Sequence, residues 1–114
     1  MAPQLPDVVL TYFDVSNGGD VAQIAGCFCS HATVFDEGKT HKGIAAIEAW
    51  QQEARRTFIY QVQPLQVAQG EGRLTVIARL TGNFPGSPVQ LSYVFTLEDH
   101  RIHSLEITPC RTLI

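Results

Sequence analysis

The first half of the chain places its apolar residues at the spacing of amphipathic helices. This spacing predicts three helices: one that follows Pro6 and ends at Asn17-Gly18-Gly19, a short one after Asp20, and a longer one over residues 43–58. Their apolar faces are formed by Val8 or Val9, Tyr12 and Val15, then by Ile24, Cys27 and Phe28, and finally by Ile44, Ile47, Trp50, Ala54 and Phe58. A strand is predicted over residues 32–36, followed by a polar turn at 38–40.

From Ile59 onward, apolar and polar residues alternate with the period of two that is typical of strands. Turn-forming segments divide this half into four predicted strands, over residues 59–68, 73–83, 89–98 and 101–108. In the third of these, one face carries only apolar side chains: Val89, Leu91, Tyr93, Phe95 and Leu97. The pattern predicts one α+β domain over residues 1–114, with three N-terminal helices packed on that face of a curved, mostly antiparallel sheet. The cone between helices and sheet is a natural place for a ligand.

The composition fits a compact domain and excludes several functional classes. Of the 114 residues, 45% are hydrophobic and 17% charged, which excludes disorder and low-complexity sequence. The net charge of −3 predicts no attraction to nucleic acid or to an anionic membrane surface. No apolar run approaches the ~20 residues that cross a bilayer, and the N-terminal segment lacks the pattern of a signal peptide. We therefore expect a cytoplasmic protein that binds neither nucleic acid nor membrane.

Three cysteines, Cys27, Cys29 and Cys110, cannot all pair within one chain. Because a single residue separates Cys27 from Cys29, a disulfide between them has poor geometry, and reduced thiols are expected. These two thiols and His31 are also a candidate metal site. Alternate positions at a helix end point in different directions, however, and no fourth ligand has suitable spacing, so no metal is expected.

Asp36 and Tyr12 are the two residues best placed for chemistry. Asp36 ends a predicted strand after Val34 and Phe35, so its carboxylate is expected at the edge of an apolar cavity, where burial raises its pKa and suits it to acid–base catalysis. The alternative is a solvated turn over residues 36–38. Tyr12 lies on the apolar face of the first helix, and a phenol in a cavity can donate to a developing oxyanion. The alternative is a core tyrosine bonded to a backbone carbonyl.

The segment from Tyr12 to Asp36, YFDVSNGGDVAQIAGCFCSHATVFD, resembles the start of the NTF2-like superfamily, specifically ketosteroid isomerase and SnoaL-like proteins. That superfamily has a tyrosine on its first helix, an Asn-x-Gly-Asp turn, a short helix and an Ala-Thr-Val-x-Asp strand. All of these occur here in register, at Tyr12, Asn17, Gly19, Asp20, Ala32, Thr33, Val34 and Asp36. Two further segments, DEGKTHKGIAAIEAW and TGNFPGSPVQLSYVFTLEDHRIHSLEITP, resemble uncharacterised SnoaL-like proteins. The resemblance covers nearly the whole chain and implies an NTF2-like cone.

The resemblance also implies roles: Asp36 as general base and Tyr12 as oxyanion donor, with no metal and no organic cofactor. In ketosteroid isomerase, a carboxylate base moves a proton between carbons while a tyrosine and a protonated aspartic acid hold the enolate oxygen. The position of that protonated acid falls at Tyr93 here, on the inward face of its strand, where a phenol still offers a hydrogen bond. Without the protonated acid, steroid isomerisation itself is not implied. The SnoaL-like group shares its name with polyketide cyclases, in which an aspartate moves a proton during an aldol ring closure, but membership of the group says little about the substrate.

Four further residues are candidates for contact with a ligand. Trp50 and Phe58 line the predicted cone, although their helical spacing suits a core role equally well. His41 precedes the third helix, where it is either a second acid–base group or an exposed turn histidine. Phe84 lies in a Gly- and Pro-rich loop and is either a pocket lid or part of an interface. Arg79 is expected to point away from the cavity, which argues against a hydrolase of the limonene-epoxide kind.

Two functions remain open from the sequence. The first is a protein that binds a hydrophobic small molecule and transfers a proton in the manner of an isomerase or a cyclase. The second is a non-catalytic module for ligand binding or dimerisation, whose cavity is filled by its own side chains. In either case a homodimer through the outer face of the sheet is predicted, since that face carries mainly uncharged residues: Thr75, Ile77, Thr81, Ser92, Val94 and Thr96.

Overall fold

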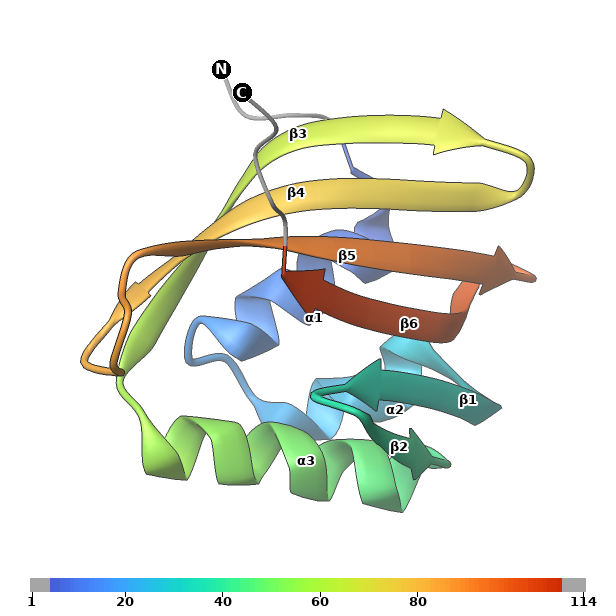
Figure 1. The fold of residues 1–114 in the computed structure, drawn as a ribbon. Coiled ribbons are helices and arrows are strands. Elements are labelled where there is room, and N and C mark those ends of the chain that lie inside the picture. The colour runs from blue at the N-terminus through green and yellow to red at the C-terminus, as the bar shows by residue number, and fades with distance from the viewer. Residues whose placement is uncertain (1–4, 110–114) are drawn as a thin grey trace.

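A six-stranded sheet curls around the helices in the computed structural model, which describes residues 5–109 (Figure 1). In chain order the elements are α1 (Asp7–Ser16), the 3₁₀ segment η1 (Val21–Gln23), α2 (Ile24–Cys27), β1 (Phe28–Asp36), β2 (Lys39–Lys42), α3 (Ile44–Thr57), β3 (Tyr60–Gly70), β4 (Arg73–Gly82), β5 (Val89–Glu98) and β6 (Arg101–Pro109). The strand order is β2-β1-β6-β5-β4-β3, in which β1 and β6 are parallel and the other neighbours antiparallel. The predicted α+β class is confirmed. No helix within residues 5–109 is long and apolar enough to cross a membrane.

Three details differ from the prediction. β1 begins at Phe28, a fully buried residue, rather than at residue 32. The segment Lys39–Lys42, part of which was predicted as a turn, is the edge strand β2. The third helix follows two strands, so the three helices are not all N-terminal to the sheet. In Figure 1, α1 and α3 both lie on the concave side of the sheet, as the predicted cone requires.

Helix α1 supplies the centre of the core. Its apolar face contributes the buried residues Val9, Tyr12, Phe13 and Val15. The ring of Tyr12 lies edge-on to those of Phe13, at 5.2 Å, and of Phe95, at 5.7 Å. Burial of each large apolar side chain stabilises the fold by roughly 1.5–3 kcal/mol. The aromatic packing therefore fixes α1 firmly against β5.

The sheet presents the predicted faces to the helices. On β4 the buried side chains are Leu74, Val76 and Ala78, whereas Arg79 is exposed. On β5 the buried side chains are Tyr93 and Phe95. The outer face is more polar than predicted, because a shallow depression on it is lined by Phe35, Arg73, Val94, Thr96, Ser104 and Glu106.

The turn after α1 is held by side chains that bond to the backbone. The Asn17 side chain accepts a hydrogen bond from the Val62 N–H at 2.6 Å and donates to the Val62 carbonyl at 2.9 Å. Gly19 lies so close to the Asp14 carbonyl oxygen that a Cβ there would sit 2.9 Å from it, so glycine is required. Asp20, after which the short helix was predicted, caps η1, because its Oδ1 accepts from the Ala22 N–H at 3.0 Å.

Candidate functional site

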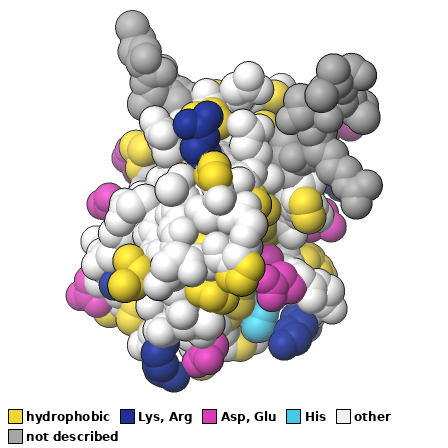
Figure 2. Space-filling view, turned by 60° about the vertical axis from the view of Figure 1, so that its left-hand side comes forward, with side chains coloured by type: hydrophobic (Ala, Val, Ile, Leu, Met, Phe, Trp, Pro, Cys, Tyr) yellow, Lys and Arg dark blue, Asp and Glu magenta, His cyan; other side chains and the backbone are white. Residues whose placement is uncertain are grey.

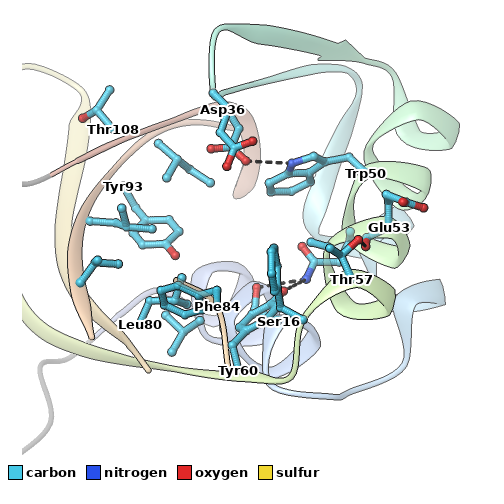
Figure 3. A pocket seen from close by; sticks show the side chains of 18 of the residues that line it. Ser16, Asp36, Trp50, Glu53, Thr57, Tyr60, Leu80, Phe84, Tyr93 and Thr108 are labelled. Atoms are coloured by element: carbon cyan, nitrogen blue, oxygen red, sulfur yellow. Dashed lines mark hydrogen bonds between the residues drawn. The ribbon is translucent and has the colours of Figure 1, made fainter. Parts of the chain in front are cut away.

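A cavity of about 730 Å³ lies between the concave face of the sheet and helices α1 and α3. Figure 3 looks into it and shows side chains from the sheet and from α3 converging on one space. Ligand pockets for drug-sized molecules measure roughly 300–1,000 Å³, so this volume suits a molecule of several rings. Its wall includes all seven residues singled out from the sequence: Tyr12, Asp36, His41, Trp50, Phe58, Phe84 and Tyr93.

Asp36 is held at the end of β1 with its carboxylate directed into the cavity (Figure 3). Its Oδ2 accepts a hydrogen bond from the indole Nε1 of Trp50 at 3.1 Å. Burial raises the pKa of Asp36, because desolvation disfavours the charged form, and the negative charge of Glu37 acts in the same direction. The Trp50 hydrogen bond and the nearby His41 oppose this rise in pKa. Asp36 is therefore a half-buried carboxylate with weakened solvation, and not the solvated turn residue of the alternative interpretation.

Three phenols line the same cavity as Asp36. The side chains of Tyr12 and Tyr93 are nearly fully buried, and that of Tyr60 is half-buried. Burial raises the pKa of all three hydroxyls, and the negative charge of Asp36 raises them further. At neutral pH each is therefore a neutral phenol that can donate a hydrogen bond. Tyr12 also packs in the core, stacked on Trp50 at 6.5 Å between ring centroids, so the two interpretations of this residue do not exclude each other.

Gln51 is a cavity residue that the sequence analysis did not single out. Its side chain is 1% exposed, and its Nε2 donates to Ser16 Oγ at 3.4 Å and to Tyr60 Oη at 3.3 Å. The available signal was a polar residue on the apolar face of α3, four positions after the buried Ile47. Ser16 and Tyr60 gave no comparable signal, because only the packing of α1, α3 and β3 brings them together.

Phe58 and Phe84 meet at one end of the cavity. Their rings pack edge to face at 6.0 Å, although one follows α3 and the other lies in the loop between β4 and β5. Phe58 is 38% exposed, so this pair lies where the cavity meets solvent. The same end of the molecule faces the viewer in Figure 2, where grouped hydrophobic side chains are flanked by acidic and basic ones. His41 is half-buried rather than exposed, with its ring 5.8 Å from that of Trp50.

The cysteines lie away from this cavity in the described part of the chain. Cys27 is buried and Cys29 half-buried, both as free thiols, whereas His31 is exposed. Cys29 groups instead with Glu98 and His103, whose ligand atoms lie within 4.8 Å of one another, and none of these three lines the cavity. Cys110 lies outside the described residues.

Comparison with known proteins gives this fold and cavity a family context. The sequence profile of the SnoaL-like domain matches residues 9–105. A Sinorhizobium meliloti protein described as a candidate polyketide cyclase is 40% identical, with a TM-score of 0.87 over 91% of this chain and 95% of that chain. A Catenulispora acidiphila protein with a ketosteroid isomerase-like fold, solved with trimethylamine, is 18% identical, with a TM-score of 0.81 over 92% of this chain and 86% of that chain.

A third solved structure is a SnoaL-like protein from Jannaschia, described as a candidate polyketide cyclase. It is 21% identical, with a TM-score of 0.76 over 95% of this chain and 90% of that chain. The likenesses at lower identity show the fold alone, which is NTF2-like. No curated protein matches the sequence. From the profile match and the 40% identity to the Sinorhizobium meliloti protein, the chain belongs to the SnoaL-like domain family.

Proposed function

We propose that this protein binds a hydrophobic small molecule in the cavity and transfers a proton within it, as an isomerase or a cyclase does. Asp36 is the base, and it removes a proton from a carbon next to a carbonyl group. The electron pair left on that carbon moves onto the carbonyl oxygen as an enolate, which the phenols stabilise by hydrogen bonds. Protonated Asp36 then returns the proton to another carbon of the enolate, as in an isomerase. In a cyclase, the enolate carbon instead attacks a second carbonyl carbon of the ligand, the π electrons of that carbonyl move onto its oxygen, and this oxygen takes the proton from Asp36. No metal or organic cofactor is needed for these steps.

The observation that carries this proposal is the carboxylate of Asp36 inside a cavity that also holds neutral phenols. A base works best when its pKa lies near the working pH, and desolvation moves Asp36 in that direction. Tyr12 and Tyr93 are the donors for the enolate oxygen, while Trp50, Phe58, Phe84 and His41 contact the ligand. The 40% identical Sinorhizobium meliloti protein, described as a candidate polyketide cyclase, supports the same reaction class.

The volume of the cavity bears on the non-catalytic alternative. A module whose interior is filled by its own side chains needs no space beside Asp36, whereas the cavity here measures about 730 Å³. That volume exceeds the roughly 300 Å³ at which ligand pockets begin. It favours a protein that admits a ligand.

Deuterium exchange tests the role of Asp36. We expect the protein to accelerate exchange of the hydrogens next to the carbonyl of 2-tetralone in D₂O, followed by NMR. Asp36→Asn keeps an oxygen that accepts from Trp50 but removes the base, and it should lower the acceleration by about 10² or more. Asp14→Asn, the same change at an exposed position on α1, should leave it unaltered.

Two results would contradict the proposal. One is an Asp36→Asn variant that exchanges as fast as the wild type. The other is a panel of one- to four-ring ketones that bind, as thermal shift detects, yet show no accelerated exchange; this second result would leave the non-catalytic function.

We also propose a homodimer through the outer face of the sheet. That face presents the 42% exposed ring of Phe35 beside a depression that contains both Arg73 and Glu106. A two-fold axis pairs the same patch with itself, so opposite charges on one patch can meet their counterparts on the other.

A further inference from the structure

Gln51 has both of its amide hydrogens engaged inside the protein. Its Nε2 donates to Ser16 Oγ on α1 and to Tyr60 Oη on β3, and the residue is 1% exposed. A carboxamide nitrogen carries two hydrogens and no lone pair for accepting, so the direction of both bonds is fixed. The two hydroxyl oxygens must accept, and neither can donate its own hydrogen to Nε2.

The direction of the Gln51 bond decides where the hydrogen of Tyr60 points. Because Tyr60 Oη accepts from Gln51, its own O–H is left to donate elsewhere, and Tyr60 lines the cavity. Burial raises the pKa of Tyr60, so the hydroxyl keeps this hydrogen at neutral pH. Figure 3 places Tyr60 and Ser16 at the end of the cavity away from Asp36.

We propose that Gln51 is a positioning residue that turns the Tyr60 hydroxyl into the cavity as a hydrogen-bond donor. Tyr60 then forms a subsite for an acceptor oxygen of the ligand, a carbonyl or an ionised phenol, at the end opposite Asp36. This inference rests on the proposed function only for which ligand reacts. The subsite itself concerns ligand binding and does not require proton transfer by Asp36. The ligand it selects is a ring compound with an acceptor oxygen at the end that lies next to Tyr60.

The binding of 2-naphthol tests the subsite, since this two-ring phenol becomes an acceptor-only oxyanion when it ionises. The measurement is the pKa of the bound 2-naphthol, followed by its absorbance, together with the Kd of the neutral and ionised forms. In the wild type, the Tyr60 donor should stabilise the ionised form and lower the pKa of the bound probe. Tyr60→Phe removes the donor and should weaken binding of the ionised form about tenfold, with a smaller effect on the neutral form.

Gln51→Glu tests the direction of the bond. A glutamate at this position accepts instead of donating, so the Tyr60 hydrogen should turn toward it and away from the cavity. We expect about tenfold weaker binding of ionised 2-naphthol. Gln52→Glu places the same new charge on the exposed side of α3 and should not change this binding. Because the new charge itself repels the ionised probe with or without the Tyr60 hydroxyl, the decisive comparison is the double variant: in a Tyr60→Phe background, Gln51→Glu should weaken binding clearly less than it does in the wild type, since only the repulsion remains.

Gln51→Leu keeps the inference testable if the buried glutamate prevents folding. Leucine removes the donor without adding charge, so the wild-type preference for ionised over neutral 2-naphthol should shrink. A merely structural role would weaken both forms alike and leave this preference unchanged. The inference is overturned if Gln51→Leu keeps the preference, or if Tyr60→Phe does. It is also overturned if the effect of Gln51→Glu persists fully in the Tyr60→Phe background.

Failure of this inference can be told apart from failure of the proposed function. Loss of deuterium exchange in Asp36→Asn, with 2-naphthol binding indifferent to Gln51 and Tyr60, would overturn the subsite alone. Binding that depends on Gln51 and Tyr60, with exchange indifferent to Asp36, would overturn proton transfer alone.

Discussion

The indole of Trp50 has a direct influence on how strongly Asp36 holds its proton. Desolvation favours the neutral carboxyl, whereas a donor such as the indole N–H favours the charged carboxylate. The two effects oppose each other, and desolvation is the larger. The pKa of Asp36 is therefore raised, although less than burial alone would raise it.

Trp50→Phe should move the pKa of Asp36 further up. The phenyl ring fills most of the indole space but offers no N–H, so the charged form loses its donor while desolvation remains. If Asp36 is the base, the acidic limb of the exchange rate against pH, along which the rate rises as Asp36 ionises, should shift to higher pH. An NMR titration of the Asp36 carboxyl carbon measures the pKa directly. A midpoint that stays in place or moves down would contradict this account of the pair.

Asp36 and Gln51 show how far the role of a single site residue can be predicted from the sequence. Asp36 could be singled out because it follows two apolar residues at the end of a predicted strand. The structure contains this strand, and Asp36 is its last residue. Gln51 also breaks a local pattern, as a polar residue on an apolar helical face. Its partners could not be predicted, because Ser16 is 35 positions away and the contact depends on how α1 and α3 pack.

At the scale of the elements, the side chain of Asn17 links the end of α1 to the backbone of β3. Asn17, just after α1, offers Val62 one acceptor and one donor, much as a neighbouring strand would. The Arg55 guanidinium on α3 donates to the Gly19 carbonyl at 2.7 Å, which ties the same turn to a third element. The turn after α1 thus holds together α1, α3 and β3, three of the elements that form the cavity.

Asn17→Ala should destabilise the fold by about 1–3 kcal/mol, because both backbone groups of the buried Val62 lose a partner. Chemical denaturation measures the free energy of unfolding. Asn83→Ala is the matched control, since the Asn83 side chain accepts from the Ile59 N–H in an exposed setting where water can replace it. A loss for Asn17→Ala no larger than that for Asn83→Ala would contradict a structural role of this turn.

β2 was missed and the start of β1 was predicted too late for the same reason: neither segment shows a regular alternation of apolar and polar residues. The segment Lys39–Lys42 is an edge strand that pairs with β1, and its four residues are all polar, so it shows no alternation. The first half of β1 contains a register shift against β6 between Phe28 and Thr33, which breaks the period of two. Phe28 also continues the helical spacing from Ile24. The remaining strands were predicted closely because each carries one apolar face.

At the scale of the whole molecule, pairing through the outer sheet face makes a clear prediction. One chain weighs 12.6 kDa, and sedimentation at micromolar concentration should give twice that mass. Phe35→Glu, which replaces the exposed aromatic ring of the proposed interface by a charge, should shift the mass toward that of one chain. Leu10→Glu changes another exposed hydrophobic residue, on α1, and should leave the dimer intact. A wild-type mass near 12.6 kDa would contradict the dimer.

The parallel pairing of β1 with β6 has a consequence for the order in which the molecule is made. Asp36 lies opposite Ile107 in that pairing, so the proposed base is supported by one of the last described residues of the chain. Contacts between such distant positions close late and slowly during folding. A nascent chain whose β6 is still inside the ribosome therefore has its helices but not the complete cavity. Chains cut short before β6 should be unable to hold a substrate.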